Sequence, residues 1–84
     1  MTNTEKLRSH VKKSGLKLSY IAKTIGLTRA ALYNKITNRS EFKASEIDEL
    51  CRILNITSYK ERESIFFAEK VDDSATFETK KRSE

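Results

Sequence analysis

Hydrophobic residues recur at helical spacing in five segments of the chain. Apolar residues three and four positions apart share one face of a helix and form the stripe that packs against a core. This spacing, with cap residues at the segment ends, predicts helices over residues 4–14, 18–25, 28–37, 45–54 and 58–70. The chain has no Pro and only two Gly, which argues against a turn-rich all-β protein. The pattern therefore predicts an all-α bundle of about five helices.

The segment ends carry residues that suit helix termini. Gly15, Gly26 and Asn38 follow predicted helices and tolerate the left-handed backbone that ends a helix. At three predicted helix N-termini a Ser or Thr is followed three residues later by an acid, which is the capping-box pattern. The pairs are Thr2 with Glu5, Ser45 with Asp48, and Ser58 with Glu61. Thr28 is the predicted cap of the third helix, and it is followed by Ala31 instead of an acid.

One domain accounts for most of the chain. The length of 84 residues fits a single small domain, and the apolar periodicity extends over residues 1–71. Residues 72–84 hold one aromatic residue and end in a mixed-charge run, so we predict a flexible C-terminal tail there. No apolar run is long enough to span a bilayer.

The residues needed for most enzyme or metal chemistry are scarce. Cys51 is the single cysteine and cannot form an internal disulfide, which favours a reducing, cytoplasmic setting. His10 is the single histidine, so a four-ligand zinc site is not expected. The chain has no Gly-rich phosphate loop. We therefore expect no enzyme activity, no cofactor and no metal, and in so small a core no small-molecule ligand.

Charge is distributed unevenly along the chain. Residues 1–40 carry nine Lys or Arg and one acid, whereas residues 41–84 carry eight bases and eleven acids. No Asp or Glu lies between Lys6 and Ser40. A cationic segment favours a polyanionic partner, because each neutralised phosphate releases a counterion. A solvated basic face without a partner is the alternative.

The second and third predicted helices are separated by Gly26 and Leu27 alone, which predicts a tight helix-turn-helix. In such a unit the N-terminal turn of the second helix can enter the DNA major groove. Ala31 stands three residues after Thr28, where a capping box would have an acid. The positive N-terminal end of the third predicted helix therefore has no acid in its first turn. That end would suit phosphates or acceptor-rich base edges, although capping boxes are optional and Ala31 also suits a core.

The stretch from Leu16 to Ile36 resembles the lambda-repressor-like family, the phage repressor and Cro regulators. The resemblance is carried by Ile21-Ala22, by Ile25-Gly26-Leu27-Thr28 and by Leu32, and a later stretch starting at Ser45 is similar to that family's fourth helix. It covers about residues 4–57, and the ending Ile-Phe-Phe-Ala-Glu-Lys-Val-Asp is similar to small prophage regulators. Leu18 stands where the family often has Gln, and Asn38 stands where Gly is common.

The resemblance implies a Cro-like or repressor-like regulator of phage or prophage origin that binds double-stranded operator DNA. It implies base contacts from the helix starting at Thr28, through Arg29, Ala30, Tyr33 and Asn34. It implies backbone contacts on either side of that helix, from Lys17, Ser19, Tyr20, Lys23, Thr28, Lys35, Asn38, Arg39, Ser40 and Lys43.

The side chains suit these roles. Arg29 can pair with guanine, Asn34 with adenine, and the Ala30 methyl can contact a thymine methyl. Arg29 could instead bind phosphate alone, and Tyr33 could be partly core.

The apolar cluster near the end of the fifth predicted helix has two interpretations. It could form a homodimer interface, through Ile65, Phe66, Phe67 and Val71. Alternatively, one Phe packs on its own domain and the other is partly exposed. A dimer would suit two operator half-sites one helical turn apart. The alternative function is a protein-interaction module, antirepressor-like or antitoxin-like, with weak DNA affinity.

Overall fold

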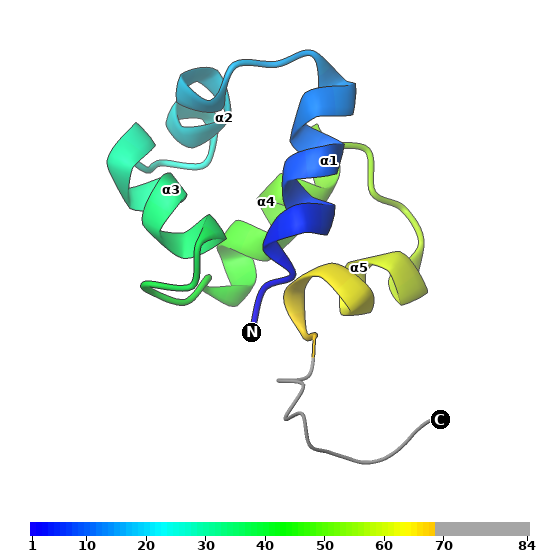
Figure 1. Ribbon diagram of the computed structural model, residues 1–84. Coiled ribbons are helices and arrows are strands. Elements are labelled where there is room, and N and C mark those ends of the chain that lie inside the picture. Colours follow the sequence, from blue (N-terminus) through cyan, green and yellow to red (C-terminus); the bar gives the residue numbers. More distant parts are fainter. Residues whose placement is uncertain (69–84) are drawn as a thin grey trace.

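The computed structural model describes residues 1–68, and within them the chain forms five helices and no strand (Figure 1). The helices are α1 (Thr4–Ser14), α2 (Leu18–Thr24), α3 (Arg29–Ile36), α4 (Ala44–Ile53) and α5 (Tyr59–Phe66). The predicted all-α fold is confirmed. The predicted tail over residues 72–84 lies outside the described residues, as does the end of the domain predicted at residue 71. None of the described helices is long and apolar enough to cross a membrane.

The helix boundaries follow the sequence pattern closely except at the end of α5. The α1 boundaries match the prediction, α2 ends one residue earlier than predicted, and α3 and α4 each differ from it by one residue at both ends. Helix α5 ends at Phe66, whereas the pattern predicts a helix to residue 70. Phe67 caps it, and the backbone N–H of Ala68 donates to the Met1 carbonyl at 3.0 Å instead of continuing the helix.

Two of the predicted N-caps are wrong. Helix α1 is capped by Asn3, whose side chain accepts from the backbone N–H of Lys6, because Thr2 is buried before the helix begins. Helix α4 begins at Ala44, so its N-cap is Lys43 and not Ser45. The acid of its first turn is Glu46, whose side chain accepts from the backbone N–H of Lys43 at 2.9 Å. Thr28 and Ser58 are confirmed as caps.

One aliphatic side chain from each helix meets at the centre of the core. The largest fully buried side chains are Leu7 of α1, Ile21 of α2, Leu32 of α3, Leu50 of α4 and Ile65 of α5. Each comes from a different helix, so burial of apolar surface fixes all five helices against one another. This shared core sets the position of α2 and α3 relative to α1.

The two ends of the described chain lie side by side. The backbone N–H of Asn3 donates to the Ile65 carbonyl at 2.6 Å, and Ala68 donates to Met1. Thr2 is hydrogen-bonded to the side chain of Asn38, just after α3. The segment before α1 is therefore held by both α3 and α5.

Candidate nucleic-acid interface

Helices α2 and α3 are joined by a four-residue link, Ile25 to Thr28. Gly26 has a φ of 81°, a left-handed conformation that most side chains disfavour. The next residue, Leu27, donates its backbone N–H to the Ala22 carbonyl at 2.8 Å, which closes the end of α2. The two helices then pack through buried Ile21, Ala22 and Leu32. The predicted left-handed turn at Gly26 is confirmed.

The N-terminus of α3 is capped but has no acid beside it. The Thr28 hydroxyl accepts from the backbone N–H of Ala31 at 3.0 Å. The first turns of α1, α4 and α5 each hold a glutamate, whereas those of α2 and α3 hold none. The positive ends of both helices in this pair are therefore not neutralised by their own first turns.

The residues predicted to contact bases lie along one side of α3. Arg29 and Ala30 are exposed, and Tyr33 is 44% exposed. Asn34 is half-buried, and its carbonyl accepts from the backbone N–H groups of Arg39 and Ser40 at 2.8 and 3.3 Å. Leu32 and Ile36 face the core from the other side of the helix. Tyr33 is thus a surface residue.

Most residues predicted to contact the DNA backbone are also exposed, and they lie at the start of α2 and along it, at the N-cap of α3, or in the loop after α3. They are Lys17, Ser19, Tyr20, Lys23, Thr28, Arg39, Ser40 and Lys43. Asn38 is exposed as well, but its side chain, like that of half-buried Lys35, is hydrogen-bonded within the fold.

Lys35 forms an ion pair with Glu46 of α4. The distance from Lys35 Nζ to Glu46 Oε1 is 2.7 Å, and the two side chains are only 13% and 10% exposed. Burial by itself raises the pKa of the Glu46 carboxyl, but the hydrogen bonds from Lys35 and from the Lys43 backbone outweigh it and lower the pKa. The Lys35 ammonium is therefore committed to holding α3 against α4.

Asn38 adopts the left-handed conformation predicted for it, with a φ of 68°. Its side-chain amide is bonded to the backbone of Thr2. This amide ties the loop after α3 to the start of the chain.

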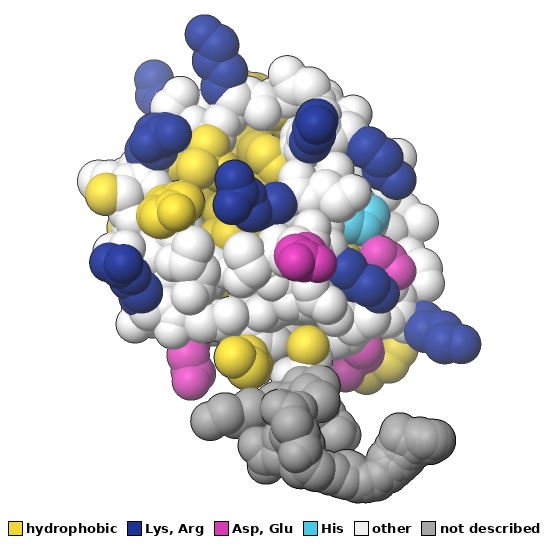
Figure 2. All heavy atoms as spheres, viewed as in Figure 1, with side chains coloured by type: hydrophobic (Ala, Val, Ile, Leu, Met, Phe, Trp, Pro, Cys, Tyr) yellow, Lys and Arg dark blue, Asp and Glu magenta, His cyan; other side chains and the backbone are white. Residues whose placement is uncertain are grey.

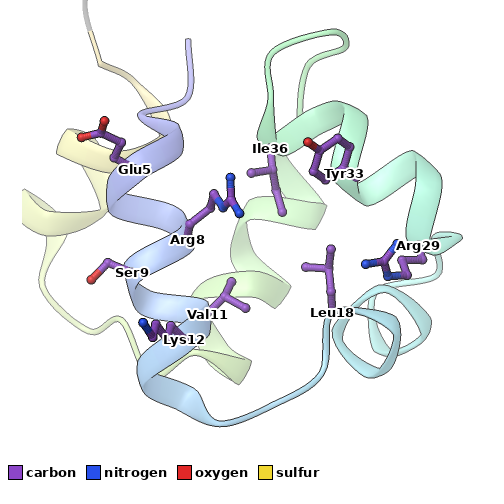
Figure 3. A pocket seen from close by; sticks show the side chains of 9 residues that line it. All are labelled: Glu5, Arg8, Ser9, Val11, Lys12, Leu18, Arg29, Tyr33 and Ile36. Atoms are coloured by element: carbon purple, nitrogen blue, oxygen red, sulfur yellow. The ribbon is translucent and has the colours of Figure 1, made fainter.

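A groove separates α1 from the α2–α3 pair. Its volume is about 480 Å³, and residues of all three helices line it (Figure 3). Val11, Leu18 and Ile36 supply apolar surface. Arg8, Lys12 and Arg29 supply positive charge. Figure 2 shows the same arrangement on the surface, where Lys and Arg side chains surround an exposed apolar patch.

Arg8 and Lys12 are not among the residues predicted for the interface from the sequence. Their spacing of four residues places them on one face of α1, within the acid-free stretch. That spacing is a usable signal, but it does not reveal that α2 and α3 lie opposite this face.

The residues predicted for a dimer interface divide between core and surface. Ile65 and Phe66 are buried in their own chain, at 0% and 4% exposure, and Phe66 packs edge-on against Phe42 with ring centroids 5.6 Å apart. Phe67 is 52% exposed. Val71 lies outside the described residues. The arrangement matches the alternative in which one Phe packs inward and its neighbour is exposed.

His10 is half-buried and pairs with Glu61 of α5, with 2.9 Å between His10 Nε2 and Glu61 Oε2. The hydrogen bond from His10 lowers the pKa of the Glu61 carboxyl. Cys51 is buried, and this burial raises the pKa of its thiol. Within residues 1–68, no three His, Cys, Asp or Glu side chains gather where they could hold a metal ion.

No protein-family model matches this chain, and comparisons with curated proteins and with solved structures also gave no match.

Proposed function

We propose that this protein is a sequence-specific, double-stranded DNA-binding regulator of the phage repressor and Cro type. The observation that carries the proposal is the start of α3. There, a Thr28-capped helix end whose first turn holds no acid presents Arg29, Ala30 and Tyr33 to solvent. The helix lies within a stretch from residue 6 to residue 40 that has no acidic side chain at all.

The chemistry of this surface matches the edge of a base pair in the major groove. Arg29 offers paired N–H donors for guanine O6 and N7, and the Ala30 methyl offers an apolar contact for thymine. Asn34 is half-buried one turn further along, so its reach to adenine would be shorter. Base reading is therefore assigned mainly to Arg29, Ala30 and Tyr33.

Phosphate contacts are assigned to exposed cations on both sides of α3. Lys17 is the N-cap of α2 and Lys23 lies on α2. Arg39 lies in the loop between α3 and α4, and Lys43 is the residue that ends this loop. Lys35 and Asn38 are left out of this set, because one is paired with Glu46 and the other with Thr2. Contacts of this kind would fix register without reading sequence.

We further propose that the protein acts as a homodimer on a two-fold symmetric operator. Phe67 and Met1, both more than half exposed, line one cavity near the two ends of the described part of the chain. This apolar surface is what a second copy could cover. Two copies would place their α3 helices in successive major grooves, about 34 Å apart.

The proposal is tested by selection from random duplexes of about 30 base pairs, followed by titration of the winning duplex and a scrambled control at two salt concentrations. We expect a symmetric site to enrich and to bind about 10³-fold more tightly than the control. Arg29→Ala should remove most of that ratio, whereas Lys60→Ala, an exposed cation on α5, should leave it unchanged.

Failure to enrich any sequence, with weak and steeply salt-dependent binding to all duplexes, would contradict the proposal. The basic surface would then be nonspecific. The protein-interaction module would become the better interpretation.

A further inference from the structure

We propose that the groove between α1 and the α2–α3 pair binds a small amphipathic organic anion, such as an aromatic or short acyl carboxylate or sulfonate. The groove's volume of about 480 Å³ falls in the range of small-molecule sites. Its wall residues come from three helices that the shared core holds in place. The binding part of this inference does not depend on the proposed function.

The groove joins an apolar floor to a cationic rim. Val11 and Leu18 are half-buried, so part of each side chain still faces solvent, and buried Ile36 lines the same groove. A ligand body that covered this floor would remove apolar surface from water, at about 25 cal/mol for each Å² buried. A phosphate group alone would leave this apolar floor exposed to water, so we expect the ligand to have an apolar part as well.

The rim cations are free to meet a negative group. Arg8 extends from α1 and Arg29 from the start of α3, each toward the space between the helices (Figure 3). Within residues 1–68, the ion pairs of the fold involve other bases, and none includes Arg8, Lys12 or Arg29. An anion between two guanidinium groups would gain charge-assisted hydrogen bonds from both sides.

One acid, Glu5, also belongs to the lining. It lies in the first turn of α1, and Figure 3 shows its carboxylate pointing away from the space between the helices. Figure 3 shows the Lys12 ammonium on the same outer side of α1, so the charge that faces the groove comes from Arg8 and Arg29. This favours an anion over a cation or a neutral ligand.

Occupancy of the groove should be coupled to DNA binding, and this step rests on the proposed function. Arg29 and Tyr33 line the groove and also belong to the proposed base-reading surface. An anion held by Arg29 would withdraw that guanidinium from a base edge. The ligand and the operator should therefore compete.

Binding is tested on the full chain with 1-anilinonaphthalene-8-sulfonate, and with N-phenyl-1-naphthylamine as the matched probe that lacks the sulfonate. We expect the sulfonate to saturate at one site per chain and to bind at least about tenfold more tightly than the neutral probe, as one charge-assisted contact would give. Arg8→Gln and Arg29→Gln should each weaken binding of the sulfonate probe about tenfold, whereas Lys60→Gln should not.

Location is tested by the backbone amide NMR shifts of the protein during the same titration. Shifts concentrated at Val11, Leu18 and Tyr33 support the groove. Shifts concentrated around Phe67, equal affinity for the two probes, or insensitivity to both arginine variants would each overturn the inference. A change of oligomeric state without saturable probe binding would overturn it as well, because a second copy would then be the occupant.

Coupling is tested by adding the selected duplex to the protein saturated with the sulfonate probe. Release of the probe supports competition, and simultaneous binding of probe and duplex overturns it. If the protein binds no duplex, the proposed function fails, while the two-probe titration still decides whether the groove holds an anion.

Discussion

The side-chain amide of Asn38 forms two hydrogen bonds with the backbone of a single distant residue, Thr2. Asn38 Oδ1 accepts from the Thr2 N–H at 2.8 Å, and Asn38 Nδ2 donates to the Thr2 carbonyl at 2.9 Å. Thr2 is buried, so these backbone groups would be poorly hydrated without the amide. The pair fixes the end of α3 relative to the start of α1, and these helices form two walls of the groove.

Replacing Asn38 separates the hydrogen bonds from the backbone conformation. Asn38→Gly keeps the left-handed φ but loses both bonds, and we expect it to lower the free energy of unfolding by about 1–2 kcal/mol. Asn38→Ala also loses both bonds but keeps a Cβ at positive φ, which Gly lacks, so its loss should exceed that of Asn38→Gly by about 1 kcal/mol. Urea denaturation measures both values. Equal stability of the two variants would contradict the role of backbone strain, and no loss in Asn38→Gly would contradict the role of the amide.

Local features of this fold could be predicted from the sequence because they depend on neighbouring residues. The left-handed turns at Gly26 and Asn38 and the Thr28 cap each involve residues within a few positions. The apolar stripes likewise predict which face of each helix is buried, because helical periodicity is a local property. The all-α fold follows from these features.

Long-range partners could not be predicted in the same way. Lys35 has the sequence context of a phosphate contact, yet its ammonium meets Glu46, which the α3–α4 loop brings beside it. The side-chain amide of Asn38 bonds to Thr2, 36 residues away, and nothing near Asn38 in the sequence indicates this partner. Periodicity shows where a side chain leaves its helix and not what it meets. The groove beside α1 is hidden from the sequence for the same reason.

The Lys35–Glu46 pair should make stability depend on pH. The lowered pKa of Glu46 means that its carboxyl binds a proton less readily in the folded chain than in the unfolded one. Its contribution is therefore complete above the ordinary value of 4.5 and is lost as pH falls through the folded pKa. Glu46→Gln should lower stability by about 1–2 kcal/mol at neutral pH, and the gap to the wild type should shrink at about pH 3.

Glu49→Gln is the matched control on the same helix. Its partner Arg52 is 73% exposed, and the Glu49 side chain is 43% exposed, so water screens the pair. We expect a change of less than about 0.5 kcal/mol, measured by urea denaturation at both pH values. A gap between Glu46→Gln and the wild type that widens on acidification would have the wrong sign for this explanation.

The Thr28 cap should stabilise the start of α3 in particular. Thr28→Ala removes the oxygen that accepts from the Ala31 N–H and should lower the free energy of unfolding by about 1 kcal/mol. Thr28→Ser keeps a hydroxyl at this position and should retain most of the stability that the cap provides. Hydrogen exchange gives the local readout. The Ala31 amide should exchange faster in Thr28→Ala than in Thr28→Ser, and unchanged protection in both would argue against the cap.

Phe67 should matter for self-association and little for folding. It is 52% exposed, whereas its neighbour Phe66 is buried. Phe67→Ser should shift sedimentation equilibrium toward monomer and change stability by no more than about 0.5 kcal/mol. Tyr59→Ser is the control, because Tyr59 is 75% exposed at the other end of α5. An equal shift in both variants, or none in either, would rule out Phe67 as the contact between copies.

Two lysines of the α2–α3 pair should differ in how they affect the salt dependence of DNA binding. Lys23 is exposed on α2, whereas the Lys35 ammonium is held by Glu46 at 2.7 Å. Each phosphate neutralised by the protein adds about 0.9 to the slope of log K against log salt. Lys23→Gln should therefore make the slope shallower by about 0.9, and Lys35→Gln should leave it unchanged while lowering stability. Titrations at several salt concentrations, run where both variants remain folded, measure the slopes. A shallower slope in Lys35→Gln would mean that its ammonium leaves Glu46 for a phosphate when DNA binds.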